Sequence, residues 1–312
     1  MKSLIRKTAA GFINFLMRSK ATIPFANALY EKGSFKFRDF FVMNVKQPGF
    51  DFNWHFTLLN GKKVDCLVQN NLPNTWHFAI SYIWHDAGLS IIEQHLNSFY
   101  NNNFAYFDIG SNVGLRSVYA LSENRPTVLF DPNPEVSKIC QQMIDLNKFK
   151  DYKIEQSGVS DSEGQLSFYI SSSAYMSSFD KEHAAKDKIV AEIKIPVTTI
   201  NLYLKANPQY QPKIVKIDVE GFEINVLKGA TDMLINYKPA LLIEILDTTD
   251  NRKAILDYLA SLNYEAFYLF NKNVGMLESA QSSNPKQNHN YLFIADEELK
   301  AHLKRLNCFS KN

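Results

Sequence analysis

Residues 104–117 read F-A-Y-F-D-I-G-S-N-V-G-L-R-S. A short run of aromatic and β-prone residues ends in Asp108, glycines follow at Gly110 and Gly114, and residues 115–121 have a helical pattern. This order predicts a buried parallel strand, a tight glycine turn and the start of a helix. Such a turn lets a ligand approach the backbone closely, and the first N–H groups of the helix are free to receive an anionic group.

The spacing of the two glycines separates the classes of ligand. Gly110-x-x-x-Gly114 is not the G-x-G-x-x-G pattern of a dinucleotide pyrophosphate site. Asp108, two residues before the first glycine, would repel a pyrophosphate and suits a cationic or amine-bearing ligand. S-adenosylmethionine (SAM) carries an ammonium, a sulfonium and a carboxylate, and no phosphate. The stretch therefore favours a SAM site, and the alternatives are a nucleotide site and an ordinary strand–helix turn.

Three later segments predict further strands with acidic ends. Residues 128–134, V-L-F-D-P-N-P, form a strand that stops at Asp131 because two prolines follow. Asp131 lies 23 residues after Asp108, the interval at which a nucleotide-binding fold places the carboxylate for a ribose diol. Residues 154–161, I-E-Q-S-G-V-S-D, predict a third strand and a turn. Residues 214–223, I-V-K-I-D-V-E-G-F-E, predict a fourth strand that ends in acidic residues.

The ordered set of motifs resembles the FkbM family of SAM-dependent methyltransferases. The motifs run from about residue 106 to residue 245 and are D-I-G-S-N-V-G, F-D-P-N-P, G-V-S-D, K-I-D-V-E-G-F-E, V-L-K-G-A and P-A-L-L-I-E. The resemblance implies a class I SAM-methyltransferase (Rossmann-like) fold, an α/β structure with a doubly wound, mostly parallel sheet. Asp131 departs from the glutamate usual in the family, which shortens the ribose-binding arm but keeps its charge. Gly158 stands where alanine is usual, a departure that we expect to matter little.

Length and composition set the frame for this fold. The 312 residues, 46% of them hydrophobic, allow one large α/β domain with an extension. We expect an N-terminal α+β extension at residues 1–100 and the methyltransferase domain at residues 101–312. The net charge of +2 gives no argument for nucleic acid as a partner. The scattered Cys66, Cys140 and Cys308 indicate free thiols in a reducing compartment, so we expect a cytoplasmic protein.

Residues 1–20 mix basic and apolar side chains without the long apolar core of a signal peptide. We favour a helix that caps the catalytic domain, and the alternative is an amphipathic helix at the inner face of a membrane. Residues 56–59 and 64–68 flank Asn60-Gly61, which is a strong hairpin signal.

The segment that follows is rich in aromatic residues and contains a helical stretch at residues 91–99. Either it forms the core that docks the extension on the sheet, or it lines the acceptor pocket. We expect residues 35–100, the hairpin included, to form one wall of that pocket, beside the carboxyl ends of the strands. The side chains that suit stacking on sugar rings are Trp54, Trp76, Tyr82 and Trp84. The nearby His77, His85 and Asp86 have no ligand pattern with cysteine, so a zinc site is not expected.

The C-terminal half predicts the remaining strands and helices of the sheet. Extra strands at residues 165–170 and 192–197 flank a polar loop at 171–188, which is either plain surface or a lid. A helix at 134–147 follows the second strand. The fifth strand, its helix and the antiparallel final strands are expected at 239–246, 251–262, 264–270 and 290–295, with a loop at 275–290.

Ligands of open α/β sheets bind beyond the carboxyl ends of the strands. Five carboxylates stand at or near the predicted ends: Asp108, Asp131, Asp161, Asp218 and Glu244. Asp131 would accept hydrogen bonds from both ribose hydroxyls of SAM, and Ser160 and Asp161 would lie near the adenine. The methionine end would be held through backbone contacts of the glycine loop. The whole predicted cofactor set is Asp108, Gly110, Ser111, Asn112, Gly114, Asp131, Asn133, Ser160 and Asp161.

Methyl transfer to a hydroxyl requires alignment of the acceptor with the methyl group and a base for its proton. The candidate groups are Lys216, Asp218, Glu220, Glu223 and Glu244. As an alternative, Asp218, Glu220 and Glu244 coordinate Mg²⁺, which lowers the acceptor's pKa. For Glu220 and Glu223, capping of the following helix is the plainer interpretation.

The sequence thus predicts a SAM-dependent O-methyltransferase of the FkbM type. The resemblance implies a small-molecule or glycan acceptor, with its hydroxyl on a sugar, a surface polysaccharide or a polyketide-like product. One alternative is N-methylation, although D-P-N-P follows the second strand and lacks the aromatic residue of the D-P-P-Y motif. Another alternative is a binding module that keeps the fold without catalysis. The glycine spacing disfavours an NAD-dependent oxidoreductase, and the sequence leaves the acceptor and the oligomeric state open.

Overall fold

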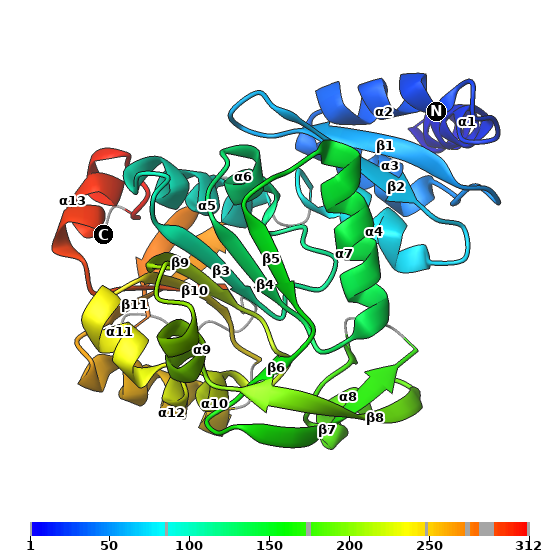
Figure 1. Ribbon diagram of the computed structural model, residues 1–312. Helices are drawn as coiled ribbons and strands as arrows, with labels where there is room; N and C mark the ends of the chain where they lie inside the picture. Colours follow the sequence, from blue (N-terminus) through cyan, green and yellow to red (C-terminus); the bar gives the residue numbers. More distant parts are fainter. Residues whose placement is uncertain are drawn as a thin grey trace.

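A large sheet lies at the centre of the molecule, with the N-terminal segment packed at one side and a small second sheet at the other (Figure 1). The computed structural model describes residues 2–84, 87–172, 176–246, 249–271, 275–280 and 290–310.

The central sheet has eight strands in the order β12-β11-β13-β10-β9-β3-β4-β5. The five from β10 to β5 are parallel, and β13, β11 and β12 are antiparallel. The predicted class I SAM-methyltransferase fold, with its antiparallel final strands, is therefore confirmed. The bounds are β3 (Ala105–Ile109), β4 (Thr127–Phe130), β5 (Tyr152–Glu155), β9 (Pro212–Ile217), β10 (Ala240–Glu244), β11 (Glu265–Asn271), β12 (Met276–Ser279) and β13 (Asn290–Ile294).

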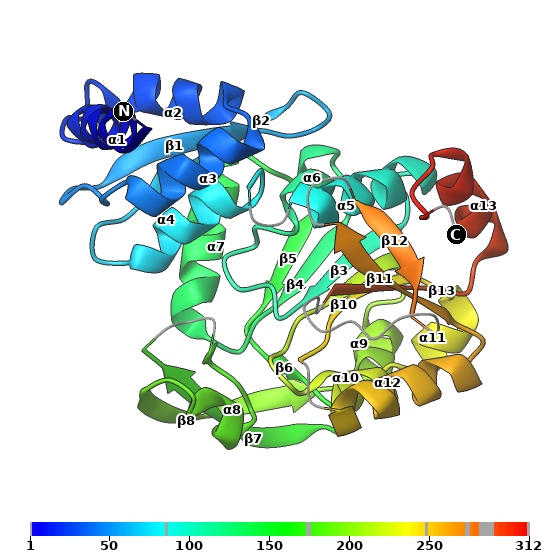
Figure 2. The same ribbon diagram turned by 180° about the vertical axis from the view of Figure 1, so that it is seen from behind.

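Helices cover both faces of this sheet because neighbouring residues of a strand point to opposite sides. Phe107 packs among residues of α9, α10, α11 and α12, whereas Tyr106 packs with α5, α6 and α13. The two groups of helices lie on opposite sides of the sheet (Figure 2). The two faces are thus separate apolar layers of a doubly wound sheet. The bounds are α5 (Ala87–Phe99), α6 (Val118–Ser122), α7 (Pro134–Asn147), α9 (Ile200–Ala206), α10 (Glu223–Lys228), α11 (Thr231–Tyr237), α12 (Thr249–Ser261) and α13 (Glu297–Arg305).

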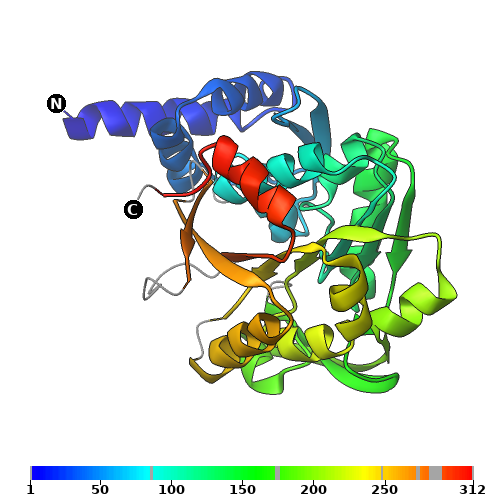
Figure 3. The same cartoon turned by 90° about the vertical axis from the view of Figure 1, so that its left-hand side faces the viewer.

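Residues 2–84, the described part of the N-terminal segment before α5, form helices α1 to α4 and a hairpin. The antiparallel pairing of β1 with β2 confirms the hairpin expected at Asn60-Gly61. Figure 3 shows α1, the dark blue helix, projecting beyond the rest of the molecule. The bounds are α1 (Lys2–Leu16), α2 (Ile23–Lys32), α3 (Phe35–Asn44), β1 (Phe52–Thr57), β2 (Lys63–Val68) and α4 (Pro73–Ser81).

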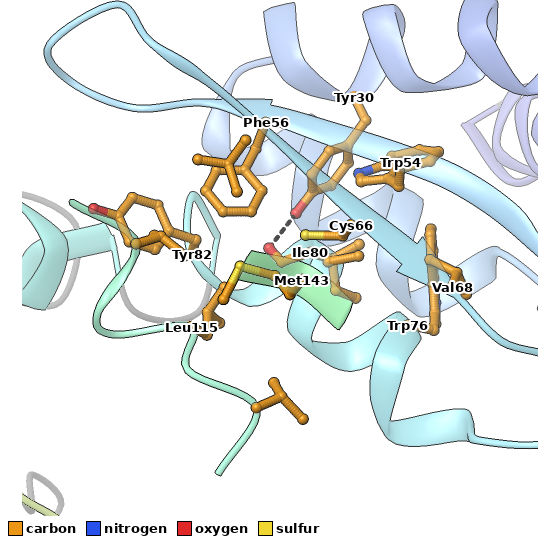
Figure 4. Close-up of a cluster of buried hydrophobic side chains, with 14 of the residues drawn as sticks. Tyr30, Trp54, Phe56, Cys66, Val68, Trp76, Ile80, Tyr82, Leu115 and Met143 are labelled. Atoms are coloured by element: carbon orange, nitrogen blue, oxygen red, sulfur yellow. Dashed lines mark hydrogen bonds between the residues drawn. The ribbon is translucent and has the colours of Figure 1, made fainter. Parts of the chain in front are cut away.

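The aromatic residues of this segment form a core rather than a pocket wall. Trp54 is fully buried, and its ring centroid lies 5.0 Å from that of Trp76 and 5.7 Å from that of Tyr30. The Tyr30 hydroxyl donates to the carbonyl of Ile80 at 2.8 Å (Figure 4). Leu115 and side chains of α7 such as Met143 belong to the same cluster. The segment and the methyltransferase domain therefore share one apolar core.

Residues 154–161 contain the end of the third strand and then a turn, as predicted, but the segment also begins a second sheet. β5 ends at Glu155, and β6 (Gly158–Val159) begins a separate three-stranded sheet of order β6-β8-β7. The two extra strands expected here are confirmed as β7 (Gly164–Ser171) and β8 (Ile189–Thr198). Within the expected polar loop lies a short helix, α8 (Lys181–Ala184), capped by the Asp180 side chain.

Three other predictions need correction or lie outside the described residues. The helix expected at 115–121 begins only at Val118, since Gly114 and Ser117 close turns onto Ser111 and Gly114. The loop expected at 275–290 contains strand β12. His85, Asp86 and residues 281–289 are outside the described part of the chain.

Among the helices of the described residues, none is both long and apolar enough to cross a membrane. Cys66, Cys140 and Cys308 are all buried and unpaired, as the sequence predicts.

Replacing Trp54 with alanine tests the shared core. We expect the free energy of unfolding to fall by about 3–5 kcal/mol, because a large buried ring leaves a cavity behind. Urea unfolding followed by circular dichroism measures the change. Phe25→Ala is the matched control, since that ring is 54% exposed, and we expect it to cost less than about 0.5 kcal/mol. A loss for Trp54→Ala no larger than the control's would contradict the account.

Candidate active site

A cavity of about 540 Å³ opens at the carboxyl ends of β3, β4, β9 and β10. The predicted residues that line it are Gly110, Ser111, Asn112, Asp131, Asn133, Lys216, Asp218, Glu220 and Glu244. The structure thus brings together most of the cofactor set and four of the five catalytic candidates of the sequence, all but Glu223. Asp108, Gly114, Ser160 and Asp161 are not among its lining residues.

The glycine loop is pressed against the end of β9. Gly110 has φ +81°, and a Cβ on it would lie 1.8 Å from the backbone oxygen of Asp218. Only glycine fits this contact without a shift of the backbone. Gly114 has φ +78°, and its Cβ would lie 2.7 Å from Cys140 Sγ. Gly110 therefore joins the loop to the acidic end of β9, whereas Gly114 serves packing against α7.

Four backbone N–H groups of the loop are used within the protein, so these four are not free to receive an anionic group. Gly110 and Ser111 both donate to the carbonyl of Phe130, at 2.9 and 3.0 Å. Asn112 donates to Asp131 Oδ2 at 2.7 Å, and Gly114 donates to the carbonyl of Ser111. What the loop offers instead is an acceptor, because the buried Asn112 Oδ1 has no hydrogen-bond partner among the described residues.

Asp131 is fixed at the end of β4 with one N–H on each oxygen. Oδ2 accepts from Asn112, and Oδ1 accepts from the backbone N–H of Asn133 at 2.8 Å. Asn133 itself caps α7, because its Oδ1 accepts from the backbone N–H of Glu135. Burial raises the pKa of Asp131 to about 7, although both N–H groups oppose the change. Each oxygen keeps further lone-pair capacity for a hydroxyl donor.

Asp108 supports the loop from behind the cavity. It is buried and accepts a hydrogen bond from Ser117 Oγ at 2.6 Å. Burial raises the pKa of Asp108 to about 6. The prediction of a direct ligand contact for Asp108 is not supported, because the side chain faces Ser117 just before α6.

Lys216 and three carboxylates form the acidic end of the cavity. Lys216 is buried, and its Nζ lies 3.0 Å from Asp218 Oδ2. Burial alone lowers the pKa of Lys216, but Asp218 and Glu244 outweigh it and hold that pKa above its ordinary value. Burial, with the charges of Asp218 and Glu244, raises the pKa of Glu220 well above the usual carboxyl range. A buried ammonium thus sits among carboxyl groups in one wall.

Glu223, named with these bases in the sequence, has a structural role. Its Oε1 accepts from the backbone N–H of Gly221 at 2.9 Å, and its Oε2 accepts from Asn251 at 3.1 Å. It is the first residue of α10 and is fully buried. The helix-capping interpretation therefore holds for Glu223, and it is removed from the candidate bases.

The residues expected near the adenine are also displaced. The Ser160 N–H donates to the carbonyl of Thr198, and Asp161 Oδ2 accepts from Asn225 at 3.3 Å, away from the cavity lining. Ser157, Gly158 and Val159 line the cavity in their place.

The departure at Gly158 matters more than expected. A Cβ on Gly158 would lie 2.3 Å from Cζ of Phe179. Phe179 is itself a lining residue of the cavity. The absent methyl group therefore leaves room for the Phe179 ring to approach the cavity.

The Mg²⁺ alternative does not fit the residues present. Within the described residues, no group of three or more His, Cys, Asp or Glu side chains is arranged to hold a metal ion. Asp218 instead pairs with the ammonium of Lys216. The mechanism proposed below therefore uses no metal ion.

Sequence reasoning missed His183. Its Nε2 lies 3.1 Å from Glu220 Oε2, and the ring is 5% exposed. Burial, with the nearby Lys186, lowers the pKa of His183. The signal available was the cap at Asp180 before K-E-H-A, which predicts a helix turn in the loop but not its partner. Only the packing of α8 beside Glu220 brings the two groups together.

Arg116 is a second missed residue. It lines the cavity, and its Nη1 lies 3.5 Å from the fully buried Glu93. Its guanidinium also stands 4.9 Å from the Tyr82 ring centroid. The position was hidden because the sequence predicts residue 116 to lie inside a helix.

The N-terminal segment does reach the cavity, but not through its tryptophans. Trp54, Trp76, Tyr82 and Trp84 are not lining residues, so their proposed stacking role is wrong. His77, Phe78 and Ser81, which all lie on α4, line the wall instead.

Comparisons with known proteins agree with this architecture. The family model described as Methyltransferase FkbM domain matches residues 108–266, half of the chain. A search of curated proteins finds no match.

Among solved structures, a methyltransferase FkbM from Methylobacillus flagellatus KT is similar, at 16% identity and a TM-score of 0.42. The likeness covers 62% of this chain and 44% of that one, so the chain spans less than half of that protein. A Streptococcus mutans protein in complex with S-adenosylhomocysteine is similar at 10% identity and a TM-score of 0.41, over 66% and 95% of the two chains. Since the family model covers half of the sequence, the chain belongs to the FkbM family of SAM-dependent methyltransferases.

Proposed function

We propose that this protein transfers the methyl group of SAM to a hydroxyl of a sugar, a surface polysaccharide or a polyketide-like acceptor. The observation that carries the proposal is the composition of a single cavity. One wall holds Asp131, whose oxygens are prepared for a diol, and another holds Lys216, Asp218, Glu220 and Glu244. Cofactor groups and proton-transfer groups therefore face the same space.

The residues present fit SAM. Asp131 would accept hydrogen bonds from the two ribose hydroxyls. Each of its oxygens is already oriented by one backbone N–H. Asn112 Oδ1, buried without a partner among the described residues, would accept from the ammonium. Apolar side chains for the adenine come from Phe130, Val159 and Phe179. Gly110, Ser111 and Asn133 would complete the cofactor site.

The bound SAM supplies a methyl carbon activated by its sulfonium. Glu220 is the group that we assign to accept the hydroxyl proton as the acceptor oxygen bonds to that carbon and the C–S electrons stay on sulfur. Lys216 would stabilise the negative charge that develops on the oxygen, and Asp218 holds Lys216 in place. Glu244, at the end of β10, would orient the acceptor.

His183 lies against Glu220, the proposed base. A Glu220 carboxyl with a raised pKa holds its proton at neutral pH, whereas a buried imidazole with a lowered pKa is neutral. The 3.1 Å contact places this neutral imidazole against Glu220, and Glu220 becomes the base when its own proton is lost as the pH rises. His183 is thus a positioning residue that acts through Glu220.

The lining of the remaining wall supports a polar, ring-shaped acceptor. Phe78 offers an apolar face, while Arg116 and Asn290 offer hydrogen-bond donors. Sugar rings combine an apolar face with hydroxyl edges, and such sites suit them.

An acceptor screen tests the function directly. SAM carrying a deuterated methyl group is incubated with sugars, polysaccharide fragments, polyketide alcohols and primary amines, and mass spectrometry locates the label. Transfer to hydroxyls supports the proposal. Transfer to amines alone would replace it with N-methylation, and SAM binding without transfer to any acceptor, including native-host extracts, would leave a silent binding module.

Asp131 makes cofactor affinity depend on pH. Its pKa of about 7 means that the acceptor-rich carboxylate form is lost as the pH falls through 7. We expect the Kd of S-adenosylhomocysteine to rise about tenfold between pH 8 and pH 6. Titration calorimetry measures this dependence.

Asp131→Asn serves as the matched control for that experiment. Its side chain does not titrate, so its weaker binding should be nearly independent of pH in this range. A wild-type Kd that is flat with pH, or a variant that keeps the wild-type slope, would remove Asp131 from the ribose site.

Glu220→Gln is expected to lower kcat by about 10²- to 10⁴-fold, the usual contribution of a positioned base. Asp218→Asn should also lower kcat, because Lys216 loses its partner. Neither change should alter the SAM Kd by more than about twofold. Asp161→Asn is the control, because it also removes a negative charge but lies outside the cavity lining. Wild-type turnover in Glu220→Gln would refute the assignment.

His183→Asn distinguishes an effect of His183 on the protonation of Glu220 from a role in packing alone. The wild-type kcat should rise with pH as Glu220 loses its proton. In the variant we expect the midpoint of that rise to shift while the SAM Kd and the melting temperature stay near wild type. An equal loss of kcat at every pH would favour a purely structural role for His183.

A further inference from the structure

We propose that helix α1 binds the surface of an anionic lipid bilayer, lying in the plane of the headgroups. The proposal concerns where the enzyme works and is independent of the acceptor. It rests on the charge of the first thirty residues, on an exposed apolar stripe and on the position of the helix.

The first thirty residues are basic without any acidic residue. They contain Lys2, Arg6, Lys7, Arg18 and Lys20, and no Asp or Glu. The rest of the chain has 29 Lys and Arg against 32 Asp and Glu, a net charge of −3. The net positive charge of the protein therefore resides entirely in this segment, which would be attracted to anionic headgroups.

An apolar stripe runs along the exposed side of α1. Ile5, Phe12 and Phe15 are 62%, 50% and 61% exposed. Their spacing of seven and three residues places them on one side of a helix. Ile13, Leu16 and Met17 are buried on another side, against the N-terminal core. The helix thus has one apolar side that the protein covers and a second that it does not.

Exposed phenylalanines are concentrated in this part of the molecule. Of the large apolar side chains that are exposed in the described residues, the phenylalanines are Phe12, Phe15, Phe25 and Phe35, all on α1 to α3. Figure 3 shows α1 extending from the body of the protein, so a flat surface can reach it. At 15 residues it is about 22 Å long, enough to lie along an interface.

The charge pattern favours a bilayer over a second copy of the chain. A two-fold interface places the same patch of both copies face to face. Lys7 and Arg18 flank the stripe and are exposed, so two such patches would bring like charges together. Anionic lipids instead supply negative charge at the edge and an apolar layer beneath it.

Vesicle co-sedimentation with the full chain tests the proposal. Vesicles of phosphatidylglycerol and phosphatidylcholine are compared with vesicles of phosphatidylcholine alone. We expect binding to the anionic vesicles, lowered about tenfold or more by Phe12→Ser with Phe15→Ser. Lys7→Gln and Arg18→Gln should each lower binding about fivefold, and 1 M salt should weaken it strongly.

Ile235→Ser is the matched control, because Ile235 is 51% exposed on α11. This variant should bind the anionic vesicles like the wild type. SAM binding and melting temperature confirm that each variant is folded. Absence of wild-type binding, equal binding to uncharged vesicles, or equal loss in the control would overturn the proposal. A dimer that the double serine variant dissociates, without vesicle binding, would assign the stripe to a second copy instead.

Discussion

The contact between Gly110 and the backbone of Asp218 is the constraint on which the site depends. A side chain at position 110 would enter the space of the Asp218 carbonyl, so the two strand ends meet only because the residue is glycine. This contact sets the glycine loop of β3 beside the carboxylates that follow β9. In the proposed site, this backbone contact would hold the loop that lines the cofactor space beside the segment that carries the base.

The electrostatics of the cavity follow from that closeness. Asp108, Asp131 and Glu220 all have raised pKa values, with burial as the first cause and neighbouring carboxylates adding to it. Lys216 is the buried cation that offsets part of this repulsion. A ligand that brings an ammonium and a sulfonium would offset more of it. The excess of carboxyl groups therefore suits a cationic cofactor and disfavours a phosphate-bearing one.

Local signals in the sequence were enough for the fold but not for every contact. Strand ends at Asp131 and Asp218, the Asn60-Gly61 hairpin and the antiparallel final strands each follow from nearby residues. The bonds of the Gly110 and Ser111 N–H groups do not, because their acceptor, the carbonyl of Phe130, belongs to another strand. His183 reaches Glu220 only through the packing of α8. The tryptophans were misassigned since aromatic composition suits a core and a sugar site equally well.

A crystal structure with S-adenosylhomocysteine is the most direct measurement of the central claim, that one cavity holds the cofactor and presents its sulfur to the acidic end. The account predicts both ribose hydroxyls within hydrogen-bond distance of Asp131 and the sulfur directed toward Lys216 and Glu220. A ribose bound away from Asp131, or a sulfur turned away from these two residues, would contradict it.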